Sequence, residues 1–170
     1  ALIAALAWLA AEHVCVINVS LVGPRNRLLE VIVGRMIERG HIIVAPVGND
    51  GPAAAALYPA AYPGVVAVTG IDRHHKVLLE AGRGPHVEFS AYGADIKAAA
   101  SPRGMVDVRG TSFASPIVAG QLAQRSRTLT RAASAAVIDA LAETAVDLGS
   151  RGRDPIYGYG WVNDAAHAAL

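Results

Sequence analysis

Three apolar runs rich in β-branched residues constrain the fold of this chain more than any other feature. They cover residues 14–21, 41–47 and 65–71. Runs without polar alternation are typical of strands buried on both faces of a sheet, and such strands occur mostly in parallel sheets that are covered by helices. A helix is predicted between the first two runs, so these two are predicted to be parallel neighbours joined by a right-handed crossover.

The succession of elements predicts an α/β fold, a three-layer sandwich with a mostly parallel sheet, in one domain over residues 1–170. Residues 72–88 are polar and contain glycine, which predicts an exposed hairpin or insertion, and residues 89–100 are predicted to hold a further strand pair. One face of the second helix is predicted from the spacing of Leu28, Val31, Ile32, Arg35 and Met36. Helices are predicted over residues 2–12, 27–39, 111–127 and 132–144, with a short one after residue 163.

Composition narrows the class of function. The chain has 15 Lys and Arg residues against 14 Asp and Glu, a formal net charge of +1, so charge indicates neither nucleic-acid nor membrane-surface binding. A hydrophobic content of 53% indicates a large buried core. The single cysteine, Cys15, excludes an internal disulfide and has no His or Cys cluster around it for zinc. The apolar start, residues 1–10, is too short to span a membrane and has no basic leader.

The clearest chemical signal is Gly-Thr-Ser-Phe-Ala-Ser-Pro at residues 110–116, followed by an apolar helical stretch. A glycine turn here delivers Ser112 to the first turn of a helix, where free N–H groups and the helix dipole favour negative charge. Pro116 is predicted to lie in that same turn, where no internal donor is lost. For an arbitrary Gly-Thr-Ser triplet, simple helix capping is the more frequent explanation.

The full string from Gly110 to Gly120 resembles the nucleophile motif of the subtilisin-like serine proteases (subtilases, peptidase family S8). It differs mainly in the residue after the serine and at Ile117, where many members carry His. Residues 16–21, 43–51, 62–68 and 157–163 also resemble subtilase segments, in the family's order and approximate spacing. The resemblance covers essentially all 170 residues and corresponds to the later part of a subtilase catalytic domain. It implies a subtilisin-like fold whose N-terminal part is missing from this chain.

By this resemblance Ser112 is the nucleophile of a serine endopeptidase, and peptide bonds are hydrolysed through an acyl-enzyme. Asn49 contributes its side-chain amide to the oxyanion hole, together with the backbone N–H of Ser112. The residue types suit the chemistry, because acyl transfer needs an attacking oxygen and a donor where the carbonyl oxygen becomes negative. In isolation, Asn49 would be interpreted as a turn residue that tolerates left-handed geometry.

The resemblance also implies two substrate-binding segments. Backbone pairing with an extended peptide gives sequence-tolerant binding, and a pocket beside it gives side-chain preference. Val22 stands where the family commonly has glycine, and Leu57 falls near the expected base of the pocket. We therefore hypothesise a shallower pocket that favours smaller or apolar side chains. The predicted pairing edge is Ser20, Leu21 and Val22, and the predicted pocket wall is Pro46, Val47 and Gly48.

The sequence lacks the other two members of a subtilase triad. Motifs resembling Asp-Ser/Thr-Gly and His-Gly-Thr, which precede the serine in the family, do not occur. None of the histidines is predicted to serve as the base, so the isolated chain is expected to be inactive or nearly so. His13 and His41 precede strands, so they are predicted to lie at the amino end of the sheet, opposite the carboxyl ends of the strands where ligands bind. The other histidines are predicted to lie in a polar segment (His74, His75 and His86) and in the terminal helix (His167).

The implied partners are a peptide or protein substrate and the missing N-terminal segment of the same domain. Without that segment we expect the fragment to have an exposed sheet edge, and we expect that edge to cause self-association of the fragment. No nucleic acid and no membrane span is expected. Subtilases often bind calcium, but Lys97 falls near a position where a carboxylate ligand would help, and no metal or other cofactor is assigned. A secreted or periplasmic location is implied by the resemblance alone.

Two other functions remain open from the sequence. The first is a catalytically silent peptide-binding or structural module with a protease fold. The second is an esterase of the α/β-hydrolase kind, which the absence of the second glycine of a Gly-x-Ser-x-Gly elbow disfavours.

Overall fold

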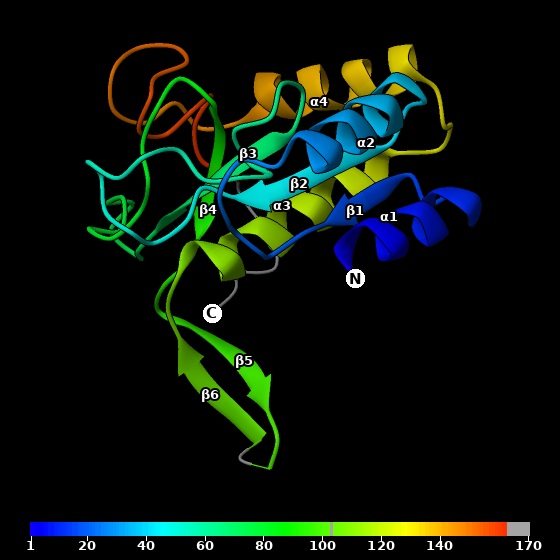
Figure 1. Cartoon of the computed structure of the whole chain (residues 1–170). Helices are drawn as coiled ribbons and strands as arrows, with labels where there is room; N and C mark the ends of the chain where they lie inside the picture. The colour runs from blue at the N-terminus through cyan, green and yellow to red at the C-terminus, as the bar shows by residue number, and fades with distance from the viewer. Residues whose placement is uncertain (103, 163–170) are drawn as a thin grey trace.

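The computed structural model describes residues 1–102 and 104–162 (Figure 1). The helix predicted after residue 163 lies outside the described residues. No helix in these two ranges is long and apolar enough to cross a membrane. In chain order the elements are α1 (Leu2–Ala11), β1 (Val16–Asn18), α2 (Arg27–Glu38), β2 (Ile42–Pro46), β3 (Val66–Ile71), β4 (Val87–Tyr92), β5 (Ile96–Ala100), β6 (Gly104–Val108), α3 (Thr111–Arg125) and α4 (Arg131–Thr144).

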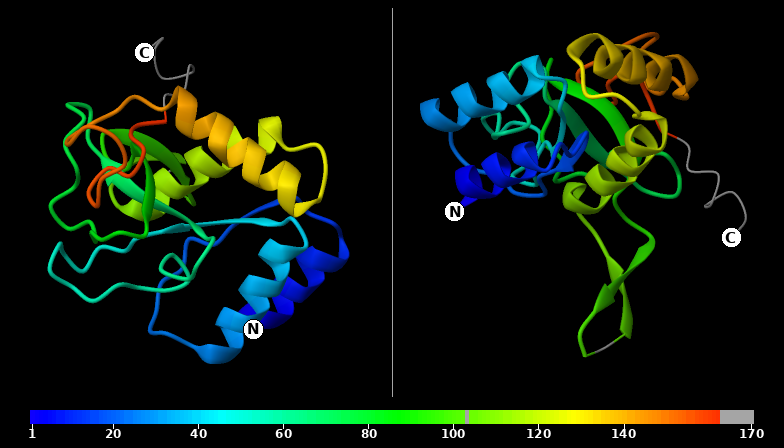
Figure 2. Two further views of the ribbon diagram at one scale, coloured as in Figure 1. Left: turned by 90° about the horizontal axis from the view of Figure 1, so that it is seen from above. Right: turned by 90° about the vertical axis from the view of Figure 1, so that its right-hand side faces the viewer.

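Four parallel strands form the central sheet in the order β1-β2-β3-β4. Every residue of β2 and β3 is buried, as the apolar runs predict. Alternate side chains of β2 enter two cores, Ile43 and Ala45 on one face and Ile42 and Val44 on the other. Helices α1 and α2 cover the first face and α3 and α4 the second (Figure 2). The predicted three-layer α/β sandwich is confirmed.

Helix α2 packs through a face that overlaps only in part with the predicted one. Met36 is buried as predicted, but Leu28 and Val31 are 61% and 50% exposed, and Val33 is buried instead. Neighbouring apolar residues on this helix allow two registers of the 3.6-residue period, and the predicted one included Arg35. The observed register leaves Arg35 in solvent, which avoids the cost of burying a charge.

The connection from β3 to β4, residues 72–86, is only partly the exposed insertion that its polar composition predicts. Leu78 and Ala81 are fully buried in the core shared with α1 and α2. The Leu78 N–H donates to the Gly70 carbonyl at 2.9 Å, which holds the returning chain against β3. This segment therefore covers part of the sheet.

The predicted strand pair within residues 89–100 is wrong in its pairing. β4 joins the central sheet beside β3, while β5 pairs antiparallel with β6. Between β4 and β5, Asp95 adopts a positive φ of 59°, and the chain turns away from the sheet there. The resulting hairpin extends from the body of the molecule, and its second strand leads directly to α3 (Figure 1).

Candidate active site

Ser112 is the second residue of α3, and the preceding glycine determines how the chain enters that helix. Gly110 has a φ of 138°, a conformation that favours glycine, and its N–H donates to the Gly93 carbonyl at 2.7 Å. Helix α3 packs against all four strands of the sheet. Ser112 is half-buried, and it belongs to the first turn of α3, where backbone N–H groups have no partner within the helix.

Pro116 lies deeper in α3 than predicted. It is the sixth residue of the helix, so its missing N–H is the one that would donate to the Ser112 carbonyl. That carbonyl accepts a hydrogen bond from the Ser20 hydroxyl at 3.1 Å instead. The proline therefore favours a contact between the backbone of Ser112 and Ser20, which lies two positions after the end of β1.

A chain of side-chain hydrogen bonds continues from Ser20. The Asn18 amide donates to the Ser20 hydroxyl at 2.8 Å, and the Ser115 hydroxyl donates to Asn18 Oδ1 at 2.5 Å. Ser115 is fully buried one turn along α3. The carboxyl end of β1 is thus fixed to the first turns of α3 at two points. Neither Asn18 nor Ser115 was predicted from the sequence to be part of the site.

Asn49 lies in the turn after β2, and its side chain reaches the start of α3. Its Oδ1 accepts from the Thr111 backbone N–H at 3.0 Å and from the Thr111 hydroxyl at 3.1 Å. A backbone N–H can only donate, so the oxygen must face Thr111 and Nδ2 must face elsewhere. A Cβ built on Gly110 would lie 3.4 Å from Nδ2. Within residues 1–102 and 104–162, Nδ2 has no hydrogen-bond partner, so it is a free donor beside the serine turn.

The predicted substrate-binding residues fall into two groups. Leu21 and Val22 are exposed after β1, and Gly23 exchanges two backbone hydrogen bonds of 2.9 Å with Tyr58. Pro46, Val47 and Gly48 are buried, and a Cβ on Gly48 would lie 2.5 Å from Leu57 Cδ1. A cavity of about 670 Å³ lies on the other side of Leu57 in the chain of contacts, and Val22 is the one predicted substrate-binding residue among those that line it. Its lining is Val22, Gly23, Pro24, Arg25, Asp50, Ala55, Ala56, Leu57 and Tyr58.

An ion pair beside Asn49 was not foreseen from the sequence. Arg109 donates from Nε and one terminal nitrogen to the two Glu80 carboxylate oxygens, at 2.7 and 2.9 Å. These hydrogen bonds hold the pKa of Glu80 below its ordinary value and raise the pKa of Arg109. The two residues are 29 positions apart and no motif joins them, so the sequence carried no signal for the pair.

The described part of the chain places no histidine as a partner of Ser112, whose hydroxyl forms no hydrogen bond there. His41 is buried next to the start of β2, with Nδ1 2.7 Å from the Val14 carbonyl. His75 Nε2 lies 3.1 Å from the Tyr92 hydroxyl. Burial lowers the pKa of His86. His13 and His74 are exposed, and His167 lies outside the described residues.

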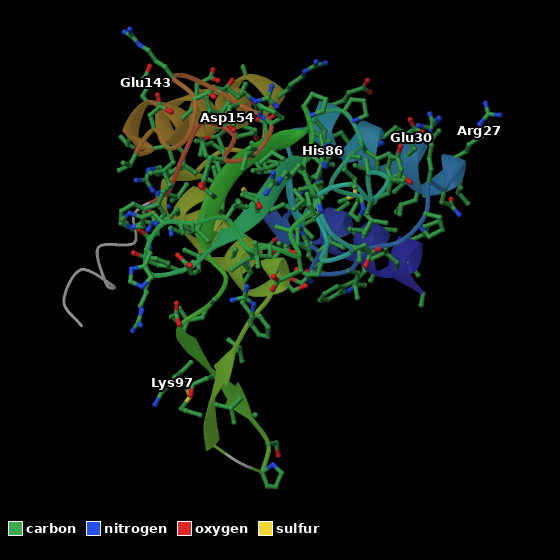
Figure 3. All side chains as sticks on the ribbon, turned by 90° about the vertical axis from the view of Figure 1, so that its left-hand side faces the viewer. Arg27, Glu30, His86, Lys97, Glu143 and Asp154 are labelled. Carbon is green, nitrogen blue, oxygen red and sulfur yellow. The ribbon has the colours of Figure 1, made fainter. Side chains whose placement is uncertain are left out.

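Side-chain metal ligands do not cluster in the described part of the chain. It contains no group of three or more His, Cys, Asp or Glu side chains that could hold a metal ion. Lys97 is exposed on β5, on the hairpin, where it places an ammonium group instead of a carboxylate (Figure 3). No step of the chemistry is therefore derived through a metal.

A parallel sheet lies between two helical layers, and a serine at a helix N-terminus lies beside an amide donor that has no partner among the described residues. The sequence profile described as the subtilase family matches residues 1–160. The fold is therefore that of a serine protease, and this chain belongs to the subtilase family.

Similar proteins of known name agree with this assignment. The minor extracellular protease Epr of Bacillus subtilis (strain 168) is 32% identical over 162 residues, which are 95% of this chain and 25% of that protein. Subtilisin DY of Bacillus licheniformis is 30% identical over 172 residues, covering 99% of this chain and 62% of the relative. The chain thus spans less than two thirds of the length of these relatives.

Solved structures show the same fold. The PatG macrocyclase domain matches with a TM-score of 0.80 at 22% identity, covering 95% of this chain and 53% of that one. A lanthipeptide protease matches with a TM-score of 0.76 at 21% identity, covering 95% and 64%. At these identities the likeness concerns the fold alone.

Proposed function

We propose that this chain is the part of a subtilisin-like serine endopeptidase that carries the nucleophile and the oxyanion donor. Ser112 Oγ attacks the carbonyl carbon of a peptide bond, and the amine leaves with a proton to give an acyl-enzyme that water then hydrolyses. Asn49 Nδ2 and the Ser112 backbone N–H donate to the carbonyl oxygen as it becomes negative.

The observation that carries this proposal is the orientation of the Asn49 amide. Thr111 takes up the oxygen of that amide with two donors, which leaves the nitrogen unpaired next to Gly110. A donor that is already positioned needs little reorganisation when charge develops, and such donors contribute the largest single share of catalysis in many enzymes.

The base and its orienting carboxylate come, in this proposal, from a segment of the same gene product outside these 170 residues. That segment is the first partner of the chain, and a peptide or protein substrate is the second. We propose further that the isolated chain is inactive or nearly so, that it associates with itself through its open sheet edge at β1, and that the parent protein is secreted, as the description of Epr as extracellular supports.

Labelling with a fluorophosphonate tests the proposal in the complete gene product. The reagent phosphonylates an activated serine, so the wild type is expected to label and Ser112→Ala to lose all labelling. Ser126→Ala is the matched control at the other end of α3, where the hydroxyl donates to the Leu122 carbonyl at 2.8 Å, and it should label normally. Labelling that persists in Ser112→Ala would refute the proposal.

The catalytically silent module is the second candidate, favoured by the unpaired Ser112 hydroxyl within the described residues. It predicts no labelling of the wild type and no Asp and His motifs in the coding sequence on the N-terminal side. A wild type that labels and carries both motifs excludes it.

The cavity bounded by Val22 and Leu57 supports a preference for smaller apolar side chains before the cut. A panel of peptides that differ at that one position measures the preference as kcat/KM. Efficient cleavage after Phe or Tyr would contradict it.

A further inference from the structure

The turn that carries Asn49 is held from both sides by one short stretch of the β3–β4 connection. The Gly82 N–H donates to the Gly48 carbonyl at 3.1 Å, and the Gly51 N–H donates to the Glu80 carbonyl at 2.8 Å. A Cβ on Gly82 would lie 2.8 Å from the Val47 carbonyl oxygen, so the close approach depends on glycine. The position of Asn49 therefore follows the position of residues 80–82.

The same stretch is tied to the serine turn by the Glu80–Arg109 ion pair. Arg109 links β6 to α3 and directly precedes Gly110. Its guanidinium makes a bidentate contact with the Glu80 carboxylate, a geometry that restrains orientation as well as distance. Asn49 itself is exposed, and the path through Glu80 and Arg109 adds a further connection between its turn and the start of α3, besides its contacts to Thr111.

We propose that Glu80 and Arg109 are positioning residues that set the geometry between the Asn49 amide and Ser112, an inference that rests on the proposed function. Neither residue contacts the reacting atoms. The pair acts through the backbone of residues 80–82 on one side and through Gly110 on the other. Small errors in the placement of an oxyanion donor weaken catalysis without weakening substrate binding.

The surroundings of the pair determine what its loss does. Asp72 and Asp95 also attract Arg109, so the guanidinium keeps acidic neighbours when Glu80 is neutralised. Without the Glu80 charge, Arg109 is drawn toward those carboxylates and no longer restrains residues 80–82. Exposed fractions of 53% for Arg109 and 30% for Glu80 mean that salt screens the pair, so high ionic strength should act in the same direction as the substitution.

A first experiment measures the Asn49 side chain without requiring catalysis. In the ¹⁵N-labelled chain, Glu80→Gln is expected to shift or broaden the Asn49 side-chain amide signals, and 1 M NaCl should do so in the wild type. Glu88→Gln is the matched control, because it removes an ion pair of 2.8 Å with Arg153 at similar exposure, 36% and 25%, and it should leave those signals in place. Unchanged signals in Glu80→Gln would overturn the proposal even if Ser112 proves catalytic.

A second experiment measures turnover in the complete gene product. Glu80→Gln is expected to lower kcat by about tenfold with KM within about twofold, less than the loss of a whole oxyanion donor. In an Asn49→Ala background, Glu80→Gln should have no further effect, because the pair acts through Asn49. The same tenfold fall in that background would overturn the inference.

Discussion

Replacing Asn49 by aspartate should change stability and catalysis in opposite directions. A carboxylate at this position keeps one oxygen for the Thr111 N–H and hydroxyl, at the 3.0 and 3.1 Å of the native contacts. Its second oxygen takes the place of Nδ2 beside Gly110. The substitution therefore preserves what Asn49 does for the fold and replaces the free donor by an acceptor.

The magnitudes follow from the position at the start of α3. A negative charge near a helix N-terminus stabilises by about 0.3–1 kcal/mol, and a hydrogen bond to a charged acceptor is stronger than one to an amide. Asn49→Asp should thus unfold at the same or slightly higher urea concentration than the wild type. Asn49→Ala, which loses both contacts to the buried Thr111, should lose about 1–2 kcal/mol. In catalysis, Asn49→Ala should lower kcat by about 10²- to 10³-fold, and Asn49→Asp by more, because it adds repulsion of the oxyanion.

Urea unfolding of the chain and steady-state kinetics of the complete gene product measure the two effects separately. Asn49→Asp that retains wild-type kcat would show that Nδ2 is not an oxyanion donor. Asn49→Asp that is less stable than Asn49→Ala would show that the oxygen does not face Thr111. The first result would refute the proposed role of Asn49 in catalysis, and the second would refute the orientation assigned to its side chain.

Two further predictions concern the end of the molecule where His86 and Asp154 lie (Figure 3). Asp154 is 8% exposed and accepts three backbone N–H groups, those of residues 150, 156 and 157, at 2.7–2.9 Å. Asp154→Ala should cost about 3–5 kcal/mol in urea unfolding, since buried donors lose their acceptor, whereas the exposed Asp139→Ala should cost almost nothing. Burial and Arg153 lower the pKa of His86, so the unfolded chain binds more protons there. The neutral His86 therefore contributes to the stability of the folded state. That contribution is complete above the unfolded pKa of about 6.5 and is lost as the pH falls from there to the folded pKa. As the pH is lowered through that window, the Tm of His86→Gln should therefore fall less steeply than the Tm of the wild type. The exposed His74→Gln is the control and should behave like the wild type. Equal slopes for His86→Gln and the wild type would contradict the prediction.

The layers of the fold were predictable because burial on both faces leaves a direct mark on sequence. The runs at residues 41–47 and 65–71 contain almost nothing but apolar residues, and both are central strands. Helix α2 shows the limit of such patterns, since its apolar residues fit two faces and only the charge of Arg35 distinguishes them. The antiparallel pairing of β5 with β6 depends on a backbone turn at Asp95, and no periodicity signals that turn.

For the site, the sequence predicted which residues to examine but not how they are held. Ser112 and Asn49 were recognised from a family motif, whereas the contacts that orient them come from residues distant in the chain. Asn18 lies 97 positions from Ser115, and Glu80 and Arg109 belong to no motif. Hydrogen bonds of this kind depend on the tertiary fold, because a polar residue in a loop has many local ways to be satisfied.

Pro116 explains why the site can be ordered without its base. A residue with an N–H at this position could itself donate to the Ser112 carbonyl within the helix, and the contact with Ser20 would then not be needed to satisfy that carbonyl. With proline, the carbonyl accepts from Ser20, which Asn18 in turn holds from the end of β1. The segment predicted to pair with substrate begins at Ser20, so its start and the nucleophile backbone are fixed to each other. The Asn49 turn is fixed separately, through Thr111 and through the Glu80–Arg109 ion pair. None of these connections passes through a histidine, so in the proposed function the binding and electrostatic parts of the site are built independently of the proton-transfer part.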